Sequence, residues 1–174
     1  DPAVVLDDDD RPWLTWGSNY DGLFLQPLQP DGTLDPSVPP VNLARRELVT
    51  DNIEAPTILK RGDRWYLFAS FDLCCFGMNS TYNVRVGRSA SLTGPYVDRD
   101  GRPMLEGGGT KVLATYGNVL APGHQTVLHE GDNWWLIHHW YNPAHDARPE
   151  LGIRPLDWDA DGWPVARGWS PATL

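Results

Sequence analysis

Short apolar segments recur along the chain in pairs, each pair joined by a polar turn that carries Asp, Gly or both. The paired segments are residues 1–6 and 13–16, residues 54–59 and 65–69, and residues 124–129 and 134–138. An apolar segment, a tight polar turn and an aromatic segment in succession are typical of a β-hairpin. We therefore predict three hairpins whose first strands begin at Asp1, Glu54 and His124.

Each hairpin is followed by a third strand-like segment and by room for a fourth. The third segments are residues 23–28, 82–89 and 151–158, and each ends near a Gly or Pro turn. The repeats begin 53 and 70 residues apart, which suits sheets of four antiparallel strands. The fold class that we predict is all-β, with blades over residues 1–52, 53–118 and 119–174 of a β-propeller.

Three blades do not close a propeller ring, because propellers have about four to eight blades. Either a segment upstream of Asp1 or a second chain supplies the other blades, or the repeats stack as an open sandwich, and we favour the upstream segment. Inward aromatic side chains should pack between blades. The residues to which we assign this packing are Trp13, Trp65, Trp134 and Trp135.

Composition and charge exclude several classes of function. The chain is 41% hydrophobic and 21% charged, which favours a folded domain over a disordered one. Fourteen basic against 23 acidic residues give a net charge of -9, so a nucleic-acid partner is not expected. No apolar run approaches the roughly 20 residues of a membrane-spanning helix.

Ionisable residues open all three predicted innermost strands. In a propeller these positions converge at one mouth of the central channel, so Asp1, Glu54 and His124 should meet there. Paired carboxylates suit glycoside hydrolysis, in which one acid protonates the departing oxygen. Glu54, between Ile53 and Ala55, is the candidate acid, and His124 is a candidate metal ligand. Each of the three residues taken alone also fits a solvated strand end or a turn cap.

Other polar residues have simpler interpretations. The four aspartates of residues 7–10 fall in a hairpin turn, and we interpret them as a solvated tip. His138 and His139 lie within an aromatic strand, and we interpret both as structural. The neighbours Cys74 and Cys75 are compatible with a vicinal disulfide or with two free thiols.

Several motifs, in their order and spacing, resemble glycoside hydrolase family 43 and in particular its endo-1,5-α-L-arabinanases. They are Asp1-Pro2, Trp16-Gly-Ser18, Ile53-Glu-Ala-Pro56, Cys74-Cys75 with Gly77 and Ser80-Thr-Tyr82, Val86-Gly-Arg-Ser89, Gly94-Pro-Tyr96, Gly107-Gly-Gly-Thr110, Pro122-Gly-His124 and Gly162-Trp-Pro164. The resemblance covers essentially the whole chain.

The resemblance implies a five-bladed propeller, of which this chain is the C-terminal part, and an inverting hydrolase of arabinan. Glu54 matches the general acid of the family, and Asp1 matches the carboxylate that modulates the pKa of the acid. His124 matches a histidine that helps to hold a calcium ion, largely through water. The resemblance further implies a secreted enzyme.

The substrate-binding candidates are Trp16, Ser18 and Arg88. The resemblance places Trp16 and Ser18 near the cleft, and Arg88 is a candidate partner for a cleft carboxylate or for an outward salt bridge.

The resemblance also implies a gap, because no residue of this chain matches the general base of the family. We therefore expect the chain alone to be catalytically incomplete. Two alternatives to an endo-acting enzyme remain open: an exo-acting arabinofuranosidase or xylosidase of the same family, and a non-catalytic carbohydrate-binding or assembly fragment.

Overall fold

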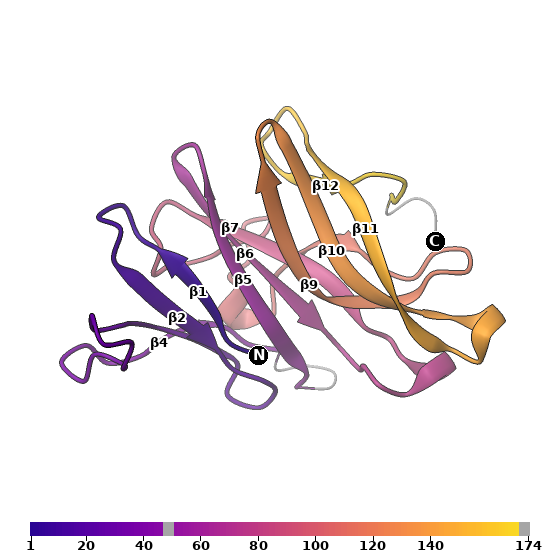
Figure 1. The fold of residues 1–174 in the computed structure, drawn as a ribbon, viewed down its shortest axis with the longest axis horizontal. Helices are drawn as coiled ribbons and strands as arrows, with labels where there is room; N and C mark the ends of the chain where they lie inside the picture. Colours follow the sequence, from indigo (N-terminus) through magenta and orange to yellow (C-terminus); the bar gives the residue numbers. More distant parts are fainter. Residues whose placement is uncertain (47–50, 171–174) are drawn as a thin grey trace.

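The computed structural model describes residues 1–46 and 51–170, and within them it contains three antiparallel sheets of four strands each (Figure 1). The first sheet has β1 (Ala3–Leu6), β2 (Pro12–Trp16), β3 (Leu23–Pro27) and β4 (Val41–Ala44). The second has β5 (Ile53–Arg61), β6 (Arg64–Phe71), β7 (Asn83–Ser89) and β8 (Thr110–Leu113). The third has β9 (Leu120–Glu130), β10 (Asn133–Asn142), β11 (Arg148–Trp158) and β12 (Pro164–Ala166).

The strands of each sheet follow one another in space as they do along the chain. This arrangement confirms the all-β class and the three four-stranded blades. Each sheet lies within one of the predicted ranges 1–52, 53–118 and 119–174. Residues 47–50 and 171–174, at or near the ends of two of those ranges, lie outside the described residues.

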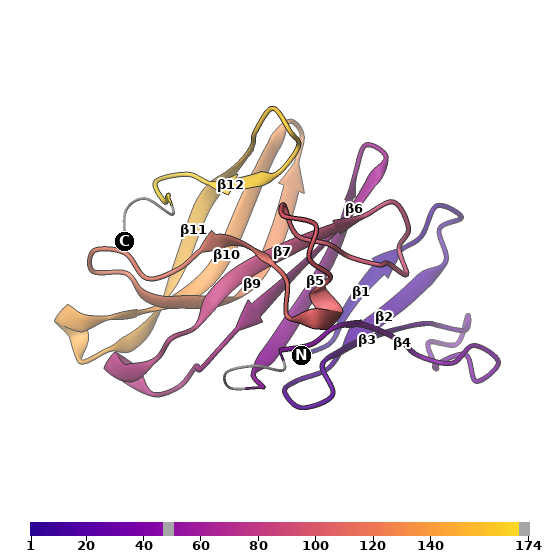
Figure 2. The same ribbon diagram turned by 180° about the vertical axis from the view of Figure 1, so that it is seen from behind.

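Three short 3₁₀ helices lie in the loops of the described chain. They are η1 (Gly77–Asn79), η2 (Met104–Glu106) and η3 (Pro143–His145). The loop that carries η2 reaches from the second sheet to β4 of the first, where Arg45 donates a backbone hydrogen bond to Met104 (Figure 2). None of the described helices is long and apolar enough to cross a membrane.

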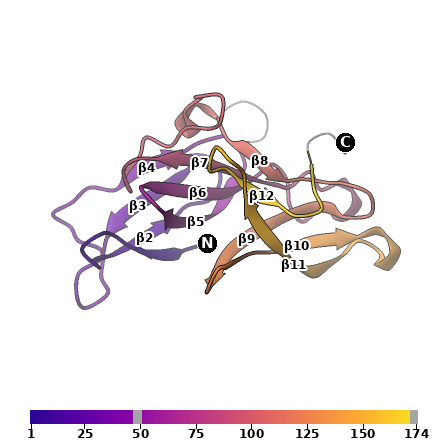
Figure 3. The same cartoon turned by 90° about the horizontal axis from the view of Figure 1, so that it is seen from above.

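The first strands of the three sheets lie beside one another. β1 packs against β5, and β5 packs against β9. The view from above places the N-terminus in the middle of the molecule, next to these strands (Figure 3). The arrangement brings three chain segments that are distant in the sequence to one central position.

The second sheet is covered on both faces, which explains why seven of the eight residues of β6 are buried. Trp65, Leu67 and Ala69 face the core shared with the first sheet. Tyr66 and Phe68, at the alternating positions, face the core shared with the third sheet. Alternation along a strand therefore places every second residue in one of two cores.

The tryptophans follow this alternation. Trp65 is buried in the first core, Trp13 packs against that core, and Trp134 packs against the second core, which confirms the prediction for these three residues. Trp135, the neighbour of Trp134, lies on the opposite, outer face of the third sheet, because adjacent residues of a strand point to opposite faces. Its assignment to inter-blade packing stays a prediction.

The two outer faces of the stack expose apolar side chains. Val4 and Leu6, which alternate with core residue Val5, are 59% and 52% exposed. Leu151 and Ile153 on β11 are 71% and 60% exposed. Each end of the three-sheet stack thus presents an apolar surface of the kind that sheets bury against other sheets.

Candidate active site

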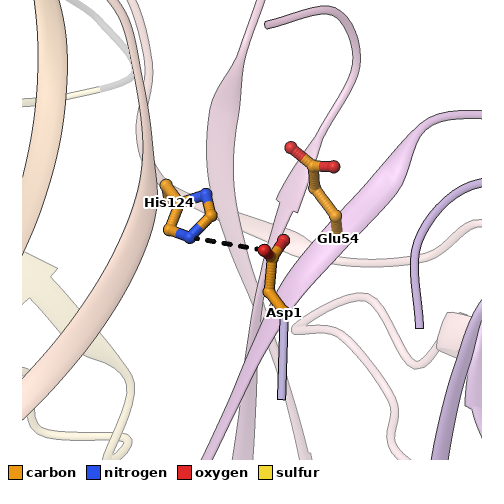
Figure 4. Close-up of side chains that lie close together, drawn as sticks. All are labelled: Asp1, Glu54 and His124. Atoms are coloured by element: carbon orange, nitrogen blue, oxygen red, sulfur yellow. Dashed lines mark ion pairs between the residues drawn. The ribbon is translucent and has the colours of Figure 1, made fainter. Parts of the chain in front are cut away.

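Asp1, Glu54 and His124 meet at the centre of the molecule (Figure 4). One carboxylate oxygen or ring nitrogen from each residue lies within 4.8 Å of the others, and His124 Nε2 is 3.7 Å from Asp1 Oδ1. Asp1 precedes β1, Glu54 is the second residue of β5, and His124 lies in β9. The predicted juxtaposition of these three side chains is therefore present.

The register by which we predicted this meeting is nevertheless wrong by one residue. Trp65 of β6 pairs with Lys60 of β5, and Trp134 of β10 pairs with His129 of β9 in the same way. Equivalent residues of the second and third sheets are therefore 69 positions apart in the sequence, not 70. By this register Glu54 corresponds to Gly123.

A β-bulge follows each of these two positions, between Glu54 and Thr57 in β5 and between Gly123 and Thr126 in β9. Ala55 and His124 occupy matching places in the two bulges, and each has a φ of 52°. A bulge redirects the side chains around it, which is how His124 reaches Glu54 without sharing its register position.

Glu54 accepts a hydrogen bond at each of its carboxylate oxygens. Tyr82 donates its hydroxyl to Oε1 at 2.6 Å, and Ser18 donates to Oε2 at 3.2 Å. The carboxylate is half-buried, and two parts of the chain that are distant from Glu54 in the sequence fix its orientation. Burial, and then the hydrogen bond to Glu54, raise the pKa of Tyr82 well above its usual range, so the phenol stays protonated and remains a donor.

The ring of Tyr82 is confined on two sides. A Cβ on Gly123 would lie 2.0 Å from the ring, so only glycine fits at that position of β9. On another side the ring stacks on His139, with the ring centroids 5.7 Å apart. The glycine in the segment Pro122-Gly-His124 thus serves the placement of the tyrosine that bonds Glu54.

The two neighbouring histidines of β10 have different surroundings. His138 is 1% exposed, and burial lowers its pKa to about 4. Its Nε2 accepts a hydrogen bond from Arg154, in keeping with the predicted structural role. His139 instead lies beside Tyr82 and 6.3 Å from the ring of His124, and burial lowers its pKa. His139 therefore belongs to the surroundings of the site, where its ring packs against the tyrosine that bonds Glu54.

A buried polar network holds β9 against the second sheet at the site. The backbone N–H of His124 donates to Ser70 Oγ at 2.8 Å, and that hydroxyl donates to Gln125 Oε1 at 2.6 Å. Gln125 in turn donates to the carbonyl of Ala55 at 2.8 Å. Ser70 and Gln125 are 0% and 3% exposed. The network ties the two bulges together and so sets the distance between Glu54 and His124.

The three predicted substrate-binding residues lie in different places. Ser18 is at the site, as its hydrogen bond to Glu54 shows. Trp16, at the same end of β2, is half-buried and stacks on Phe24 with ring centroids 6.0 Å apart.

Arg88 lies at the far end of β7 and does not reach the site. It donates to the carbonyl of Asp161 at 2.7 Å and covers the ring of Trp163 at 4.4 Å. Its assignment to the cleft was wrong, because β7 enters the sheet at the site with Asn83 and has run to the opposite end by Arg88.

Cys74 and Cys75 form a disulfide with each other. Cys74 packs against the cluster of Tyr82, Tyr141 and Ala147, and the backbone N–H of Cys75 donates to the Tyr141 hydroxyl at 2.8 Å. The cystine thus joins the loop before Tyr82 to the third sheet.

The donor set at the site is compatible with a hydrated cation. Two carboxylate oxygens and one imidazole nitrogen are too few for calcium, which takes about six to eight oxygen ligands. The side chains of His124 and Asp1 are 50% and 37% exposed, so solvent reaches them and water can complete a coordination shell. The residues present therefore fit a cation held in large part through water.

Comparison with known proteins gives a consistent result. Residues 1–164 match the family described as glycosyl hydrolases family 43. An extracellular exo-α-(1->5)-L-arabinofuranosidase of Cellvibrio japonicus is 39% identical over 94% of this chain and 50% of its own length. An extracellular endo-α-(1->5)-L-arabinanase of Bacillus subtilis is 38% identical over 94% of this chain and 49% of its own length.

Solved structures agree with these matches. An exo-1,5-α-L-arabinanase from a bovine ruminal metagenomic library superposes with a TM-score of 0.91 at 42% identity, over 96% of this chain and 56% of the other. An α-L-arabinanase of Cellvibrio cellulosa complexed with arabinohexaose superposes with a TM-score of 0.89 at 36% identity, over 95% and 56% of the two chains. The present chain thus spans about half the length of the relatives that it matches. The family match, the relatives and the three-bladed fold agree that the chain belongs to glycosyl hydrolase family 43.

Proposed function

We propose that this chain carries the acid half of an arabinan-cleaving site, in which Glu54 is the general acid. The observation that carries the proposal is the carboxylate of Glu54, oriented by Tyr82 and Ser18 and placed beside Asp1 and His124. In the proposed reaction Glu54 gives its proton to the glycosidic oxygen as the bond to the anomeric carbon breaks. The hydroxyls of Tyr82 and Ser18 then stabilise the carboxylate that forms.

Asp1 is proposed to act on Glu54 through its charge. Its carboxylate lies close to Glu54, and a neighbouring negative charge favours the protonated state that a general acid needs. An inverting pair is about 6.5–9.5 Å apart, so that a water fits between the carboxylates and the sugar. The closest oxygens of Asp1 and Glu54 lie within 4.8 Å, which is too close for Asp1 to be the base of an inverting pair.

The general base of the proposed inverting mechanism is therefore supplied from outside this chain. Two observations support a complementing segment: the relatives are about twice as long, and both outer faces of the stack are apolar. A segment that packs on these faces would close the ring around Asp1, Glu54 and His124. The same segment would bring a third carboxylate to the opposite side of the sugar.

The substrate that we propose is α-1,5-linked arabinan, cleaved internally. One relative is named an arabinanase, and one solved structure is complexed with arabinohexaose. Exo-action is the second candidate, because the other curated relative is named an exo-arabinofuranosidase at almost the same identity. The third candidate function is that of a non-catalytic carbohydrate-binding fragment.

We further propose that His124 helps to hold a calcium ion and that the protein is secreted. When bound, the ion would supply fixed positive charge at the site, where His124 and water would hold it. A ligand bond from Glu54 would exclude the proton that Glu54 must donate, so His124 and water are the proposed ligands. Secretion is supported by the two relatives that are named extracellular.

The test uses this chain alone and the same chain joined to the N-terminal half of the Bacillus subtilis relative, which we term the complemented enzyme. Linear 1,5-arabinan is the substrate, product length is followed by chromatography, and the anomer first released is followed by NMR. We expect no turnover by the chain alone, and mixed oligosaccharides with inversion from the complemented enzyme. Turnover by the chain alone or a retained anomer would contradict the proposal, and release of a single small product would favour exo-action.

A further inference from the structure

The loop between β2 and β3, residues 17–22, is folded tightly on itself and on the first sheet. Gly17 and Gly22 have φ values of 128° and 88°. A Cβ on Gly17 would lie 2.2 Å from the carbonyl oxygen of Gly22, and one on Gly22 would lie 2.0 Å from the carbonyl oxygen of Ala44. Only glycine fits at either end, so the path of this loop is fixed by backbone contacts.

Side-chain and backbone hydrogen bonds hold the same loop from both sides. The N–H of Asn19 donates to the carbonyl of Ile53 at 2.8 Å, and Asn52 donates to the side chain of Asn19 at 2.8 Å. Asn42 donates to the carbonyl of Asp21 at 2.6 Å. The loop is thereby attached to the start of β5 and to β4, and its position relative to the active site is set.

At the tip of this loop the chain exposes a large aromatic side chain. Tyr20 is 84% exposed, so burial of its ring contributes almost nothing to folding. Tyr20 and Asn19 have φ values of 38° and 56°, in the left-handed region that side chains other than glycine rarely adopt. Strained backbone that persists at such a position is typical of ligand-binding sites, where the surrounding structure holds it.

The loop also contributes directly to the active site. Ser18, two residues before Tyr20, donates to Glu54 Oε2 at 3.2 Å. The loop lies at the end of the molecule where the N-terminus and the start of β5 lie (Figure 1). The segment that orients the acid through Ser18 thus also carries the exposed ring of Tyr20.

We propose that Tyr20 is a stacking platform for a sugar unit next to the scissile bond, and that it determines the preference for chains over small glycosides. This inference rests on the proposed function. The apolar face of a pentose ring packs on an aromatic ring, and tyrosine offers that surface with few torsions to restrict. A loop that is already ordered loses little further freedom when the sugar binds, which favours affinity.

The test measures binding of linear arabinohexaose to the full chain by isothermal titration calorimetry. Tyr20→Ala and Tyr20→Asn both remove the ring, and asparagine tolerates the left-handed backbone that a φ of 38° requires at this position. We expect both to weaken binding by about 3- to 10-fold, and Tyr20→Phe to bind within about 2-fold of the unchanged chain. Leu151→Ala, which truncates a similarly exposed side chain on the outer face of the third sheet, is the control and should bind as the unchanged chain does.

The outcomes separate this inference from the proposed function. If the unchanged chain binds arabinohexaose and both ring-deleted variants bind equally well, the platform is refuted and the proposed function stands. If Tyr20→Phe is as weak as Tyr20→Ala, the hydroxyl carries the interaction, and stacking is refuted. If the unchanged chain does not bind arabinohexaose, the titration is repeated with the complemented enzyme that carries Glu54→Gln, which prevents turnover. Absence of binding there refutes both the platform and the proposed substrate.

Discussion

The hydroxyl of Tyr82, the residue directly before β7, donates a 2.6 Å hydrogen bond to Oε1 of Glu54 in β5, although the two residues are 28 positions apart. The third sheet takes part in this contact, since Gly123 and His139 enclose the tyrosine ring. The orientation of the proposed acid thus depends on two sheets and on the loop that carries Ser18.

Replacing Tyr82 by phenylalanine should reduce kcat/KM of the complemented enzyme by about 10- to 100-fold on linear arabinan, because a hydrogen bond to a charged group is lost in the transition state. The alkaline limb of the pH-rate profile should move to higher pH, since the carboxylate loses a donor. The matched control is Tyr66→Phe, because Tyr66 donates an equally short bond to the Gly162 carbonyl at the far end of the sheet. Equal kinetic losses in the two variants would contradict this account of Tyr82.

Substituting alanine for Gly123 should displace the ring of Tyr82, because the added Cβ would lie 2.0 Å from it. We expect loss of both activity in the complemented enzyme and free energy of unfolding, the latter by about 1–3 kcal/mol from overpacking. Gly152→Ala is the comparison, since its Cβ would meet the ring of His138 at 2.5 Å. It should lower stability without a comparable change in kcat. Normal kcat in Gly123→Ala would show that the position of Tyr82 does not matter.

Removing the hydroxyl of Ser70 should leave the N–H of His124 and the side-chain oxygen of Gln125 without this buried partner. Each unsatisfied buried group costs about 1–3 kcal/mol. Urea denaturation of Ser70→Ala should therefore show a lower free energy of unfolding by at least about 1 kcal/mol. A variant as stable as the parent chain would mean that water replaces the hydroxyl and that the network does not hold the two bulges together.

Acid should destabilise the chain through His138. Its pKa is lowered from 6.5 to about 4 by burial, so the unfolded chain binds a proton there more readily than the folded chain. The contribution of neutral His138 to the free energy of unfolding is fully present above pH 6.5. It declines as the pH falls toward 4, by at most roughly 1.4 kcal/mol per pH unit.

The measurement is the free energy of unfolding at pH 7 and pH 5, for the parent chain and for His138→Gln. The parent chain should lose more stability than the variant between these two pH values. Parallel declines would show that other groups cause the loss.

The sequence predicts much of this fold because its signals are local. Each hairpin carries its own turn and its own aromatic strand, and a third strand follows each hairpin as predicted. The three ionisable residues also meet as predicted. Asp1 precedes β1, Glu54 lies at the start of β5, and His124 lies in the bulge of β9, and these three strands lie beside one another.

The features that were missed depend on contacts between distant segments. Tyr82, Ser70 and Gln125 are ordinary strand residues in the sequence, and only the packing of β9 on the second sheet gives them roles at the site. The one-residue error at His124 arose because an ionisable residue was matched with an ionisable residue, whereas strand pairing matches His124 with Ala55 in the bulge of β5. Arg88 was misplaced because the motif gives no indication of which end of the sheet it occupies.

The most direct test of the account is the leaving-group dependence of Glu54→Gln in the complemented enzyme. On linear arabinan, whose departing oxygen needs a proton, kcat/KM should fall by roughly 10²- to 10⁴-fold. On an aryl arabinofuranoside with an acidic phenol as leaving group, the fall should be far smaller. Equal losses on both substrates would contradict the assignment of Glu54 as the proton donor.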